Sequence, residues 1–446
     1  GFSGNLESTY PYVTFPAWKT YSTGRNPAKL DVYYWYKFDS SEGSLEFANS
    51  TDFKAKELWD YLEDSGFVSG VINMPSTYPP KEMEGFMVSG TLASEEDDYV
   101  SPSEMKQDLS EIDYRINPES EKGTEEWLEE VKTLFGKRTD LALEKLDEVD
   151  FMHLTFFFTD NVQHNYWDSE ETLEVWREVD RQIGRLLEED VNLMIMSDHG
   201  FQELEKFFFV NSWLEGQGYL QRNKDMGDRV QKTGFNRDRI FGIVKSLHLQ
   251  DLARKIIPKS VRRKIPRENG FVEETDMAPK IDFDNSKAFA LSEGPLYIIE
   301  DNGEDKERIK EEIKAGLESL EDGKLIKEVI DGQKIYSGEY ENTAPDLFLD
   351  QSPGIEIRMD LSDKIIDEEC GTSSWIANHR QEGVYAAYGP DFSEGEKNIN
   401  IYDLMPTILS FYDIQVPSDV DGEVRTELFA ESSEAKMHKA IDDLDI

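Results

Sequence analysis

Residues 191–201 read VNLMIMSDHGF, an apolar run that ends in a short polar turn. Apolar runs of this length, bounded by polar residues, are typical of strands buried in a parallel sheet. Asp198 and His199 follow the run, and open α/β sheets form their sites at the carboxyl ends of strands. Gly200 lets the backbone bend there. The stretch therefore predicts a strand that delivers two polar side chains to a site, although a capping Asp beside a surface His would look the same.

Similar apolar runs recur along the chain and alternate with amphipathic helical patterns. The runs span residues 67–72, 151–158, 288–291, 296–299, 347–349 and 383–388, and the helical patterns span 58–63, 127–135, 173–187 and 306–320. Strands and helices that alternate over a whole chain predict an α/β fold, with helices on both faces of a mostly parallel central sheet. We therefore expect these strands to be parallel.

The composition limits the partners of the protein. The 446 residues include 93 acidic and 48 basic ones, which gives a net charge of -45. Such a surface repels nucleic acid, so we expect no nucleic-acid partner. Heavily acidic surfaces favour a halophilic source over an ordinary acidic protein, although many halophile proteins use arginine where this chain has abundant lysine. The sequence does not indicate an oligomeric state.

The cysteine content and the apolar runs bear on the location of the protein. Cys370 is the only cysteine, which excludes an internal disulfide. No signal peptide is visible, and no run approaches the ~18 apolar residues of a transmembrane segment. We therefore expect a cytoplasmic protein. The chain begins at Gly1 without a methionine, so we also expect the natural N-terminus to be missing.

Further histidines extend the site predicted at Asp198 and His199. Asp160 and His164 follow the run at 151–158, and their spacing of four points both side chains the same way if a helix begins there. A helix N-cap Asp with a chance His is the alternative. His379 precedes the run at 383–388. Asp and His are ligands that Zn²⁺ and similar ions take. These five side chains suffice for two divalent ions ~4 Å apart, which can bind the attacking and leaving oxygens of a phosphoryl transfer.

Thr14 is the candidate nucleophile. It lies in the segment PYVTFPAW of residues 11–18, where it could begin a helix and project its hydroxyl into the crevice. A metal bound to that hydroxyl would lower its pKa, and the helix N-terminus would help to hold a phosphate. Thr14 could also be a helix N-cap residue, and the two roles are compatible.

Six segments in a fixed order resemble a known family. They are VTFPAWKTYSTGRNP from Val13, INMPSTYPP from Ile72, FTDNVQH from Phe158, SDHGF from Ser197, NHRQEGVYAAYGP from Asn378 and IYDLMPTILSFYDIQVPSDVDG from Ile401. Together they span nearly the whole chain. The chain resembles the alkaline phosphatase superfamily, in particular its type I phosphodiesterase/nucleotide pyrophosphatase branch. The resemblance implies an alkaline-phosphatase-like α/β/α sandwich with inserted cap regions, and a metal-dependent hydrolase of phosphate esters, more a phosphodiesterase than a monoesterase.

The resemblance also implies roles for the site residues. Thr14 corresponds to the nucleophile, which forms a phospho-threonine intermediate. The ligands of one metal correspond to Asp160, His164 and His379, and those of the other to Asp198, His199 and Thr14; zinc is the usual ion of this branch.

Two departures from the family pattern affect this assignment. The family has one more ligand, an Asp at the end of a first strand that would lie before Gly1. Ala17 stands where nucleotide pyrophosphatases carry an Asn that helps to hold the phosphate. We therefore expect an incomplete second metal site, and phosphate contacts from elsewhere in the chain.

The resemblance and the composition divide the chain into four parts. We expect residues 1–201 to form the first part of the catalytic core without its first strand, 202–280 a cap, 281–430 the second part of the core, and 431–446 an acidic tail. Residues 237–267 hold ten basic and two acidic residues, with apolar ones at helical spacing. This basic segment either packs the cap onto the core or attracts an anionic substrate or membrane surface.

The expected substrate is a small-molecule or lipid-linked phosphate ester. A phosphotransferase that acts on a lipid- or glycan-linked phosphate is one alternative, because the basic segment fits it. A non-catalytic member that binds an anion is another, because the upstream Asp is missing. A sulfatase is disfavoured, since Cys370 lies in no motif of that kind.

Overall fold

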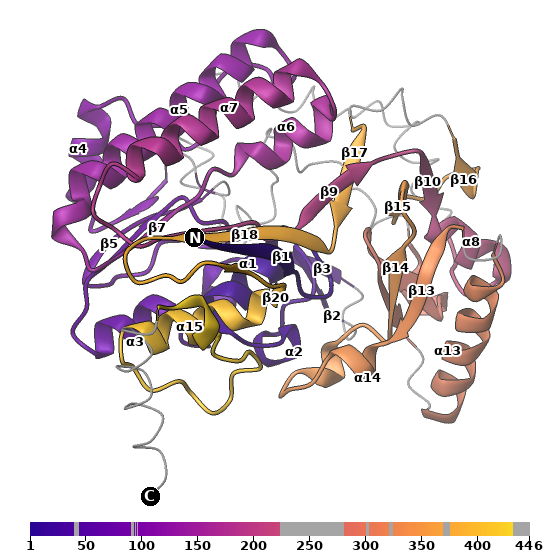
Figure 1. The fold of residues 1–446 in the computed structure, drawn as a ribbon. Helices are drawn as coiled ribbons and strands as arrows, with labels where there is room; N and C mark the ends of the chain where they lie inside the picture. The colour runs from indigo at the N-terminus through magenta and orange to yellow at the C-terminus, as the bar shows by residue number, and fades with distance from the viewer. Residues whose placement is uncertain are drawn as a thin grey trace, which may run out of the picture.

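Helices and strands alternate along the described part of the chain (Figure 1). The computed structural model describes residues 1–39, 44–90, 93, 95, 97–223, 281–299, 303–320, 324–368 and 375–430. The basic segment 237–267, most of the expected cap and the acidic tail lie outside the described residues. The α/β class is confirmed.

The first sheet carries the N-terminal strand in its middle. Its order is β19 (Gly395–Glu396), β1 (Phe2–Glu7), β18 (Glu382–Tyr388) and β8 (Leu193–Met196), and β20 (Ile399–Asn400) also pairs with β1. β18 runs antiparallel to both β1 and β8, with Tyr385 opposite Met196. The expectation that 191–196 and 383–388 are parallel strands is therefore wrong.

A long two-stranded ribbon explains this antiparallel pairing. β9 (Gly200–Glu203) continues β8 after a three-residue turn, and β17 (Ala377–Arg380) precedes β18 with one residue between them. β9 pairs antiparallel with β17, with Phe201 opposite His379, so β8 and β18 must run antiparallel too. The backbones come close at the turn, because a Cβ on Gly200 would lie 2.0 Å from the Glu382 carbonyl oxygen. The ribbon places residues near 199 beside residues near 379.

The second sheet matches the expected parallel arrangement more closely. Its order is β6 (Val100–Ser101), β5 (Gly85–Val88), β4 (Ser69–Ile72) and β7 (Phe151–Leu154). β4 is parallel to β5 and to β7, with Val71 opposite His153, whereas β5 and β6 are antiparallel. The described strands thus form mixed sheets, and a mostly parallel central sheet is not confirmed.

Helices lie on both sides of these sheets, as Figure 1 shows. One side carries α1 (Thr14–Thr23), α2 (Pro27–Leu30), α3 (Leu58–Asp64) and α15 (Leu404–Phe411), and the other carries α4 (Met105–Glu111), α5 (Glu125–Lys145), α6 (Phe158–Tyr166) and α7 (Glu170–Leu186). The Thr124 and Ser169 side chains cap α5 and α7 by accepting bonds from Trp127 and Thr172 N–H groups. The expected helices at 58–63, 127–135 and 173–187 are confirmed.

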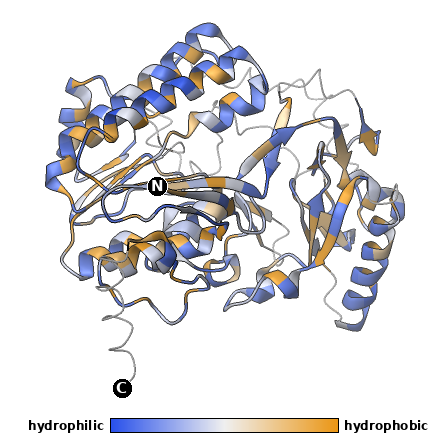
Figure 2. Ribbon diagram, in the orientation of Figure 1, coloured by the Kyte–Doolittle hydropathy of each residue, from blue (hydrophilic) through white to orange (hydrophobic). Residues whose placement is uncertain are grey.

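A separate lobe holds the strands between residues 281 and 360. Its antiparallel sheet has the order β11 (Ala288–Ala290), β12 (Pro295–Ile298), β14 (Leu347–Gln351) and β13 (Ile326–Asp331), with α13 (Gly303–Glu318) and α8 (Val210–Gln217) nearby. We expected parallel strands here, and that was wrong. Only four residues join β11 to β12, too few for the crossover that parallel strands need. Figure 2 shows apolar strands in this lobe and a largely polar α13.

The lobe is anchored to the rest of the fold by its core. The buried cluster that contains Phe289, Leu296 and Leu349 also contains Val13 and Phe15 at the start of α1. Ala17 and Trp18 of the same helix belong to a second cluster with Leu6 and Tyr385, so α1 packs against both the lobe and the first sheet.

Short elements complete the described part. They are β2 (Tyr36–Asp39), β3 (Ser44–Phe47), β10 (Lys206–Phe209), β15 (Ile355–Arg358), β16 (Ile366–Asp367), α14 (Gly332–Ile335) and the 3-10 turns Ser50–Asp52, Leu146–Glu148, Phe283–Asn285, Glu341–Thr343, Ile401–Asp403 and Thr426–Leu428. Among the described residues, no helix is both long and apolar enough to cross a membrane.

Candidate metal centre and nucleophile

His199 lies in the turn between β8 and β9, beside the start of α1. Its Nδ1 donates to the Gly200 carbonyl oxygen at 3.2 Å, which leaves Nε2 without a hydrogen. This Nε2 is 3.3 Å from Asp198 Oδ2 and 3.4 Å from the Thr14 hydroxyl. The structure thus brings these three predicted residues together.

Asp160 and His164 lie one turn apart on α6 and point the same way. The spacing predicted this, and Asp160 Oδ1 is 3.5 Å from His164 Nε2. His164 Nδ1 donates to the Ala377 carbonyl oxygen at 2.8 Å, so its Nε2 also faces the centre without a hydrogen. The N-cap residue of α6 is Phe157, so the alternative in which Asp160 is the N-cap is wrong.

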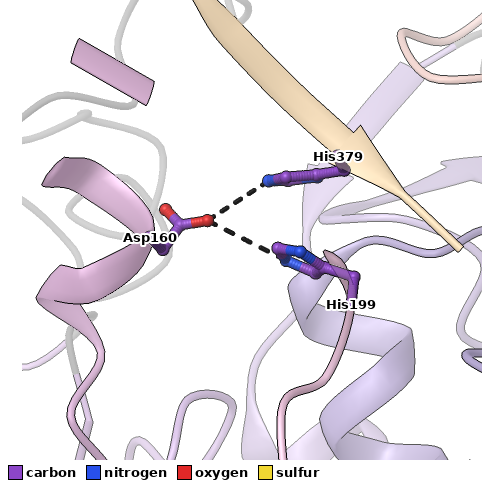
Figure 3. Close-up of side chains that lie close together, drawn as sticks. All are labelled: Asp160, His199 and His379. Carbon is purple, nitrogen blue, oxygen red and sulfur yellow. Dashed lines mark hydrogen bonds and ion pairs between the residues drawn. The ribbon is translucent and has the colours of Figure 1, made fainter. Parts of the chain in front are cut away.

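His379 on β17 faces the same point from the ribbon. Its Nε2 is 3.2 Å from Asp160 Oδ1 and 3.1 Å from His164 Nε2, and its Nδ1 is 2.7 Å from Glu293 Oε1. Figure 3 shows Asp160 from the helix opposite the two rings of His199 and His379. All six predicted site residues therefore belong to one cluster.

The tautomers in this cluster favour a bound cation. Each of the three imidazoles has an oxygen neighbour at Nδ1 and turns Nε2 toward Asp160. Two imidazole lone pairs 3.1 Å apart repel each other unless a proton or a cation lies between them. The ligand atoms of Asp160, His199 and His379 all lie within 4.8 Å of one another, and such an N/O donor set suits Zn²⁺.

The close group does not follow the expected division between two ions. His199 was expected at one metal, with Asp160 and His379 at the other, yet these three side chains are within reach of a single ion. The residues fit a metal centre, and the assignment of ligands to two separate ions stays a prediction.

The charge state of His379 reflects its two carboxylate neighbours. Burial lowers the pKa of His379, but Glu293 and Asp160 outweigh that effect and raise it to about 10. Burial raises the pKa of Asp160, but the charges and hydrogen bonds of His164 and His379 hold it well below its usual range. In the metal-free chain a protonated His379 therefore offsets part of the negative charge of the two carboxylates.

Asp198 and His199 are shifted toward their neutral forms. Burial, followed by the charge of Asp160, raises the pKa of Asp198 to about 7. Burial, followed by the charge of His379, holds the pKa of His199 well below its usual range. Without a metal, the centre thus disfavours a negative charge on Asp198 and a positive charge on His199. A bound divalent cation would favour the charged carboxylate and the neutral imidazole.

Thr14 is the first residue of α1, and its side chain is buried. Val13 occupies the N-cap position with no side-chain cap bond, so the interpretation of Thr14 as the N-cap residue is wrong. Thr14 is 4% exposed. The N–H groups of Thr14 and Phe15 lie in the first helical turn, where they have no intrahelical acceptor. The hydroxyl, the helix N-terminus and His199 meet at one place, as the nucleophile hypothesis requires.

Two residues at the centre were missed by the sequence reasoning. Glu293 contacts His379 from the β11–β12 turn, and Trp375 stacks on His164 with ring centroids 3.7 Å apart. Lys122 lies near Trp375, with Nζ 5.9 Å from the ring centroid. Neither position follows a central strand, so no pattern in the sequence marked them. Lys122 offers a cation near the centre, whereas Ala17 offers no polar group.

Comparisons with solved structures show the same fold at low sequence identity. Human ectonucleotide pyrophosphatase/phosphodiesterase 5 matches with a TM-score of 0.54 and 14% identity over 95% of this chain and 89% of that chain. The murine protein matches with a TM-score of 0.56 and 13% identity over 96% and 92%. Phosphonoacetate hydrolase from Sinorhizobium meliloti 1021 matches with a TM-score of 0.57 and 14% identity over 90% and 85%. No curated protein matches the sequence.

The family model gives the more specific result. The model described as type I phosphodiesterase / nucleotide pyrophosphatase matches residues 1–380, which include every predicted site residue. This agrees with the resemblance of the six segments and with the fold of the solved structures. The chain therefore belongs to the type I phosphodiesterase / nucleotide pyrophosphatase family.

Proposed function

We propose that this chain is a metal-dependent hydrolase of phosphate esters, and specifically a phosphodiesterase with Thr14 as its nucleophile. One observation carries the proposal: the Thr14 hydroxyl lies 3.4 Å from His199 Nε2, at the edge of the cluster formed by three imidazoles and Asp160. A hydroxyl nucleophile beside a candidate metal centre and a helix N-terminus is the arrangement that phosphoryl transfer needs.

The reaction proceeds in two displacements. Thr14 Oγ attacks phosphorus, the bond from phosphorus to the leaving alkoxide breaks, and the hydroxyl proton passes to solvent. Water then attacks the phospho-threonine and releases Thr14 and the phosphate product. The free N–H groups at the start of α1 lie where they can bind phosphate oxygens. When bound, two divalent ions, zinc by the nature of the donors, would neutralise the phosphate and lower the pKa of the hydroxyl.

The ligands divide between the ions as the family resemblance implies. Asp160, His164 and His379 would hold one ion, and Asp198, His199 and Thr14 the other. The second set has only two ionisable protein ligands among the described residues, so it would bind its ion more weakly. Lys122 is the candidate for the phosphate contact that Ala17 does not provide.

The solved relatives support chemistry at phosphorus. One murine structure is described as an inactive variant, with a threonine replaced by alanine, in complex with AMP. Phosphonoacetate hydrolase was solved with phosphonoacetate bound. These ligands belong to those proteins, and for this chain they support a substrate with a phosphorus-centred anion. Ala17 argues against a nucleotide pyrophosphatase that depends on the Asn of that position.

The test compares three variants on a chromogenic phosphodiester after chelation and reloading with zinc. Thr14→Ala should abolish turnover, and Thr14→Ser should keep part of it because the hydroxyl survives. Thr20→Ala is the matched control: Thr20 lies on the same helix, is fully buried, and its hydroxyl has no hydrogen-bond partner among the described residues. Normal turnover by a folded Thr14→Ala chain would exclude the covalent mechanism.

The same assay separates the remaining alternatives. A phosphotransferase would form a new ester when an alcohol acceptor is added, whereas a non-catalytic anion-binding protein would bind the diester without turnover. The described structure contains no feature that favours either one over hydrolysis.

A further inference from the structure

Glu293 reaches the candidate centre from a different part of the fold. It lies in the turn between β11 and β12 of the lobe, in the left-handed region with φ 62°. Its own N–H donates to the Ile357 carbonyl oxygen at 2.9 Å, and the carbonyl oxygen of Gly294 accepts from Leu349 N–H at 2.9 Å. A non-glycine residue in this conformation costs of order 1 kcal/mol, and two neighbouring strands hold the turn in place.

The carboxylate of Glu293 has one partner, which is His379. Glu293 Oε1 lies 2.7 Å from His379 Nδ1, and the two residues are 6% and 5% exposed. Neither atom has an aligned hydrogen bond in the described part of the chain, so the contact between them is an ion pair. Burying a carboxylate is costly unless it is paired. The contact with His379 therefore offsets the cost of burying the Glu293 charge in this turn.

The contact decides which nitrogen of His379 faces the centre. The carboxylate beside Nδ1 favours a hydrogen on that nitrogen, so Nε2, 3.2 Å from Asp160 Oδ1, is the nitrogen that a metal would bind after displacing its proton. The lobe also holds the backbone of this histidine, because Gln351 Nε2 donates to the His379 carbonyl oxygen at 3.3 Å. Both the ring and the main chain of His379 are therefore positioned by the lobe sheet.

We propose that Glu293 is a positioning residue that orients His379 and increases its basicity as a metal ligand, so that the lobe sets the metal affinity of the centre. The inference rests on the proposed metal-dependent function. Carboxylates that bind the second nitrogen of a metal-ligating imidazole fix its tautomer and strengthen its bond to the metal. A purely structural ion pair would stabilise the lobe without changing metal affinity.

The experiment measures zinc affinity by competition with a chromogenic chelator at constant pH. Glu293→Gln should weaken the tight zinc site about tenfold and Glu293→Ala about a hundredfold, because loss of such a partner costs 10–100-fold. Glu356→Gln is the matched control: Glu356 is equally buried, lies on β15 beside the same lobe, and pairs with Arg358 rather than with a predicted ligand. Its zinc affinity should equal that of the wild type.

Two outcomes would overturn the proposal. One is equal zinc affinity in wild type, Glu293→Gln and Glu293→Ala. The other is an NMR spectrum of the zinc-loaded wild type, with ¹⁵N-labelled histidine, in which His379 binds the metal through Nδ1. The spectrum needs no variant, so it decides the question even if the Glu293 variants fail to fold. Absence of zinc from the wild type would instead refute the proposed function, which keeps the two failures distinct.

Discussion

Replacing Asp198 by Asn should make the metal-free chain more stable, and the gain should depend on pH. Burial and the charge of Asp160 raise the pKa of Asp198 from 3.8 to about 7. Between these values the folded chain holds a proton that the unfolded chain has lost, so stability falls as the pH rises. One pH unit corresponds to about 1.4 kcal/mol, which gives roughly 3 kcal/mol between pH 5 and pH 7.

Asparagine has the same shape and does not titrate. The stability of Asp198→Asn relative to wild type should therefore increase by about 2–3 kcal/mol between pH 5 and pH 8, where the lower figure allows for the 16% exposure of the Asp198 side chain. Saturating zinc should reverse the order, because the metal requires the carboxylate and stabilises only the form that binds it.

The assay is unfolding by urea at pH 5 and pH 8, first with EDTA and then with zinc. Asp180→Asn serves as the control, since Asp180 is exposed on α7 and its replacement should not produce a pH-dependent difference. If Asp198→Asn and wild type differ by the same amount at both pH values in EDTA, the assignment of a buried, proton-holding Asp198 is refuted.

Four further measurements test the centre and its support. Zinc affinity should rise at least tenfold per pH unit from pH 6 to pH 9, because zinc displaces the proton of His379, whose pKa is about 10; a plateau above pH 7 in chelator competition would contradict this. Metal analysis during titration should show one tight and one weaker zinc site, whereas two equally tight sites would require another ligand. Gly200→Ala should lower the unfolding free energy by about 1–3 kcal/mol and weaken zinc binding, because the added Cβ meets the Glu382 carbonyl oxygen. Gly184→Ala in α7 is the control: it has open space around it and should raise the melting temperature. Phe289→Ala should cost about 3–5 kcal/mol in urea unfolding, because this ring is fully buried in the lobe core; a loss below 1 kcal/mol would show that the lobe does not unfold with the rest.

The sequence by itself predicted the fold class, which the structure confirms, and the candidate residues of the centre. Apolar runs, helical periodicity and the spacing of Asp160 and His164 are local properties, so they indicate which segments form strands or helices and which way nearby side chains point. The six motif segments then identified the family, and the family model confirms it. Thr14 at the start of a helix followed from the X-Pro turn after it, although its N-cap interpretation did not hold.

Strand direction was decided only by the tertiary structure. An apolar run has the same composition in a parallel and an antiparallel sheet, so the runs at 191–196 and 383–388 gave no information on their mutual direction. The pairing of β9 with β17 fixed it, because each continues into the neighbouring strand of the sheet. The same limitation explains why the strand directions in the lobe were predicted wrongly. β11 and β12 are antiparallel because the short turn that holds Glu293 joins them.

Tertiary structure alone also decided how the ligands meet and what supports them. His199 and His379 are 180 positions apart, and the antiparallel ribbon brings their rings within 3.7 Å between centroids. Glu293 became visible only when the lobe turn was placed against β17, since no local pattern connects an acidic hairpin residue to a distant histidine. The sequence specifies which chemical groups are present, whereas distances, tautomers and shifted pKa values depend on burial and on contacts between remote segments, which only the folded chain provides.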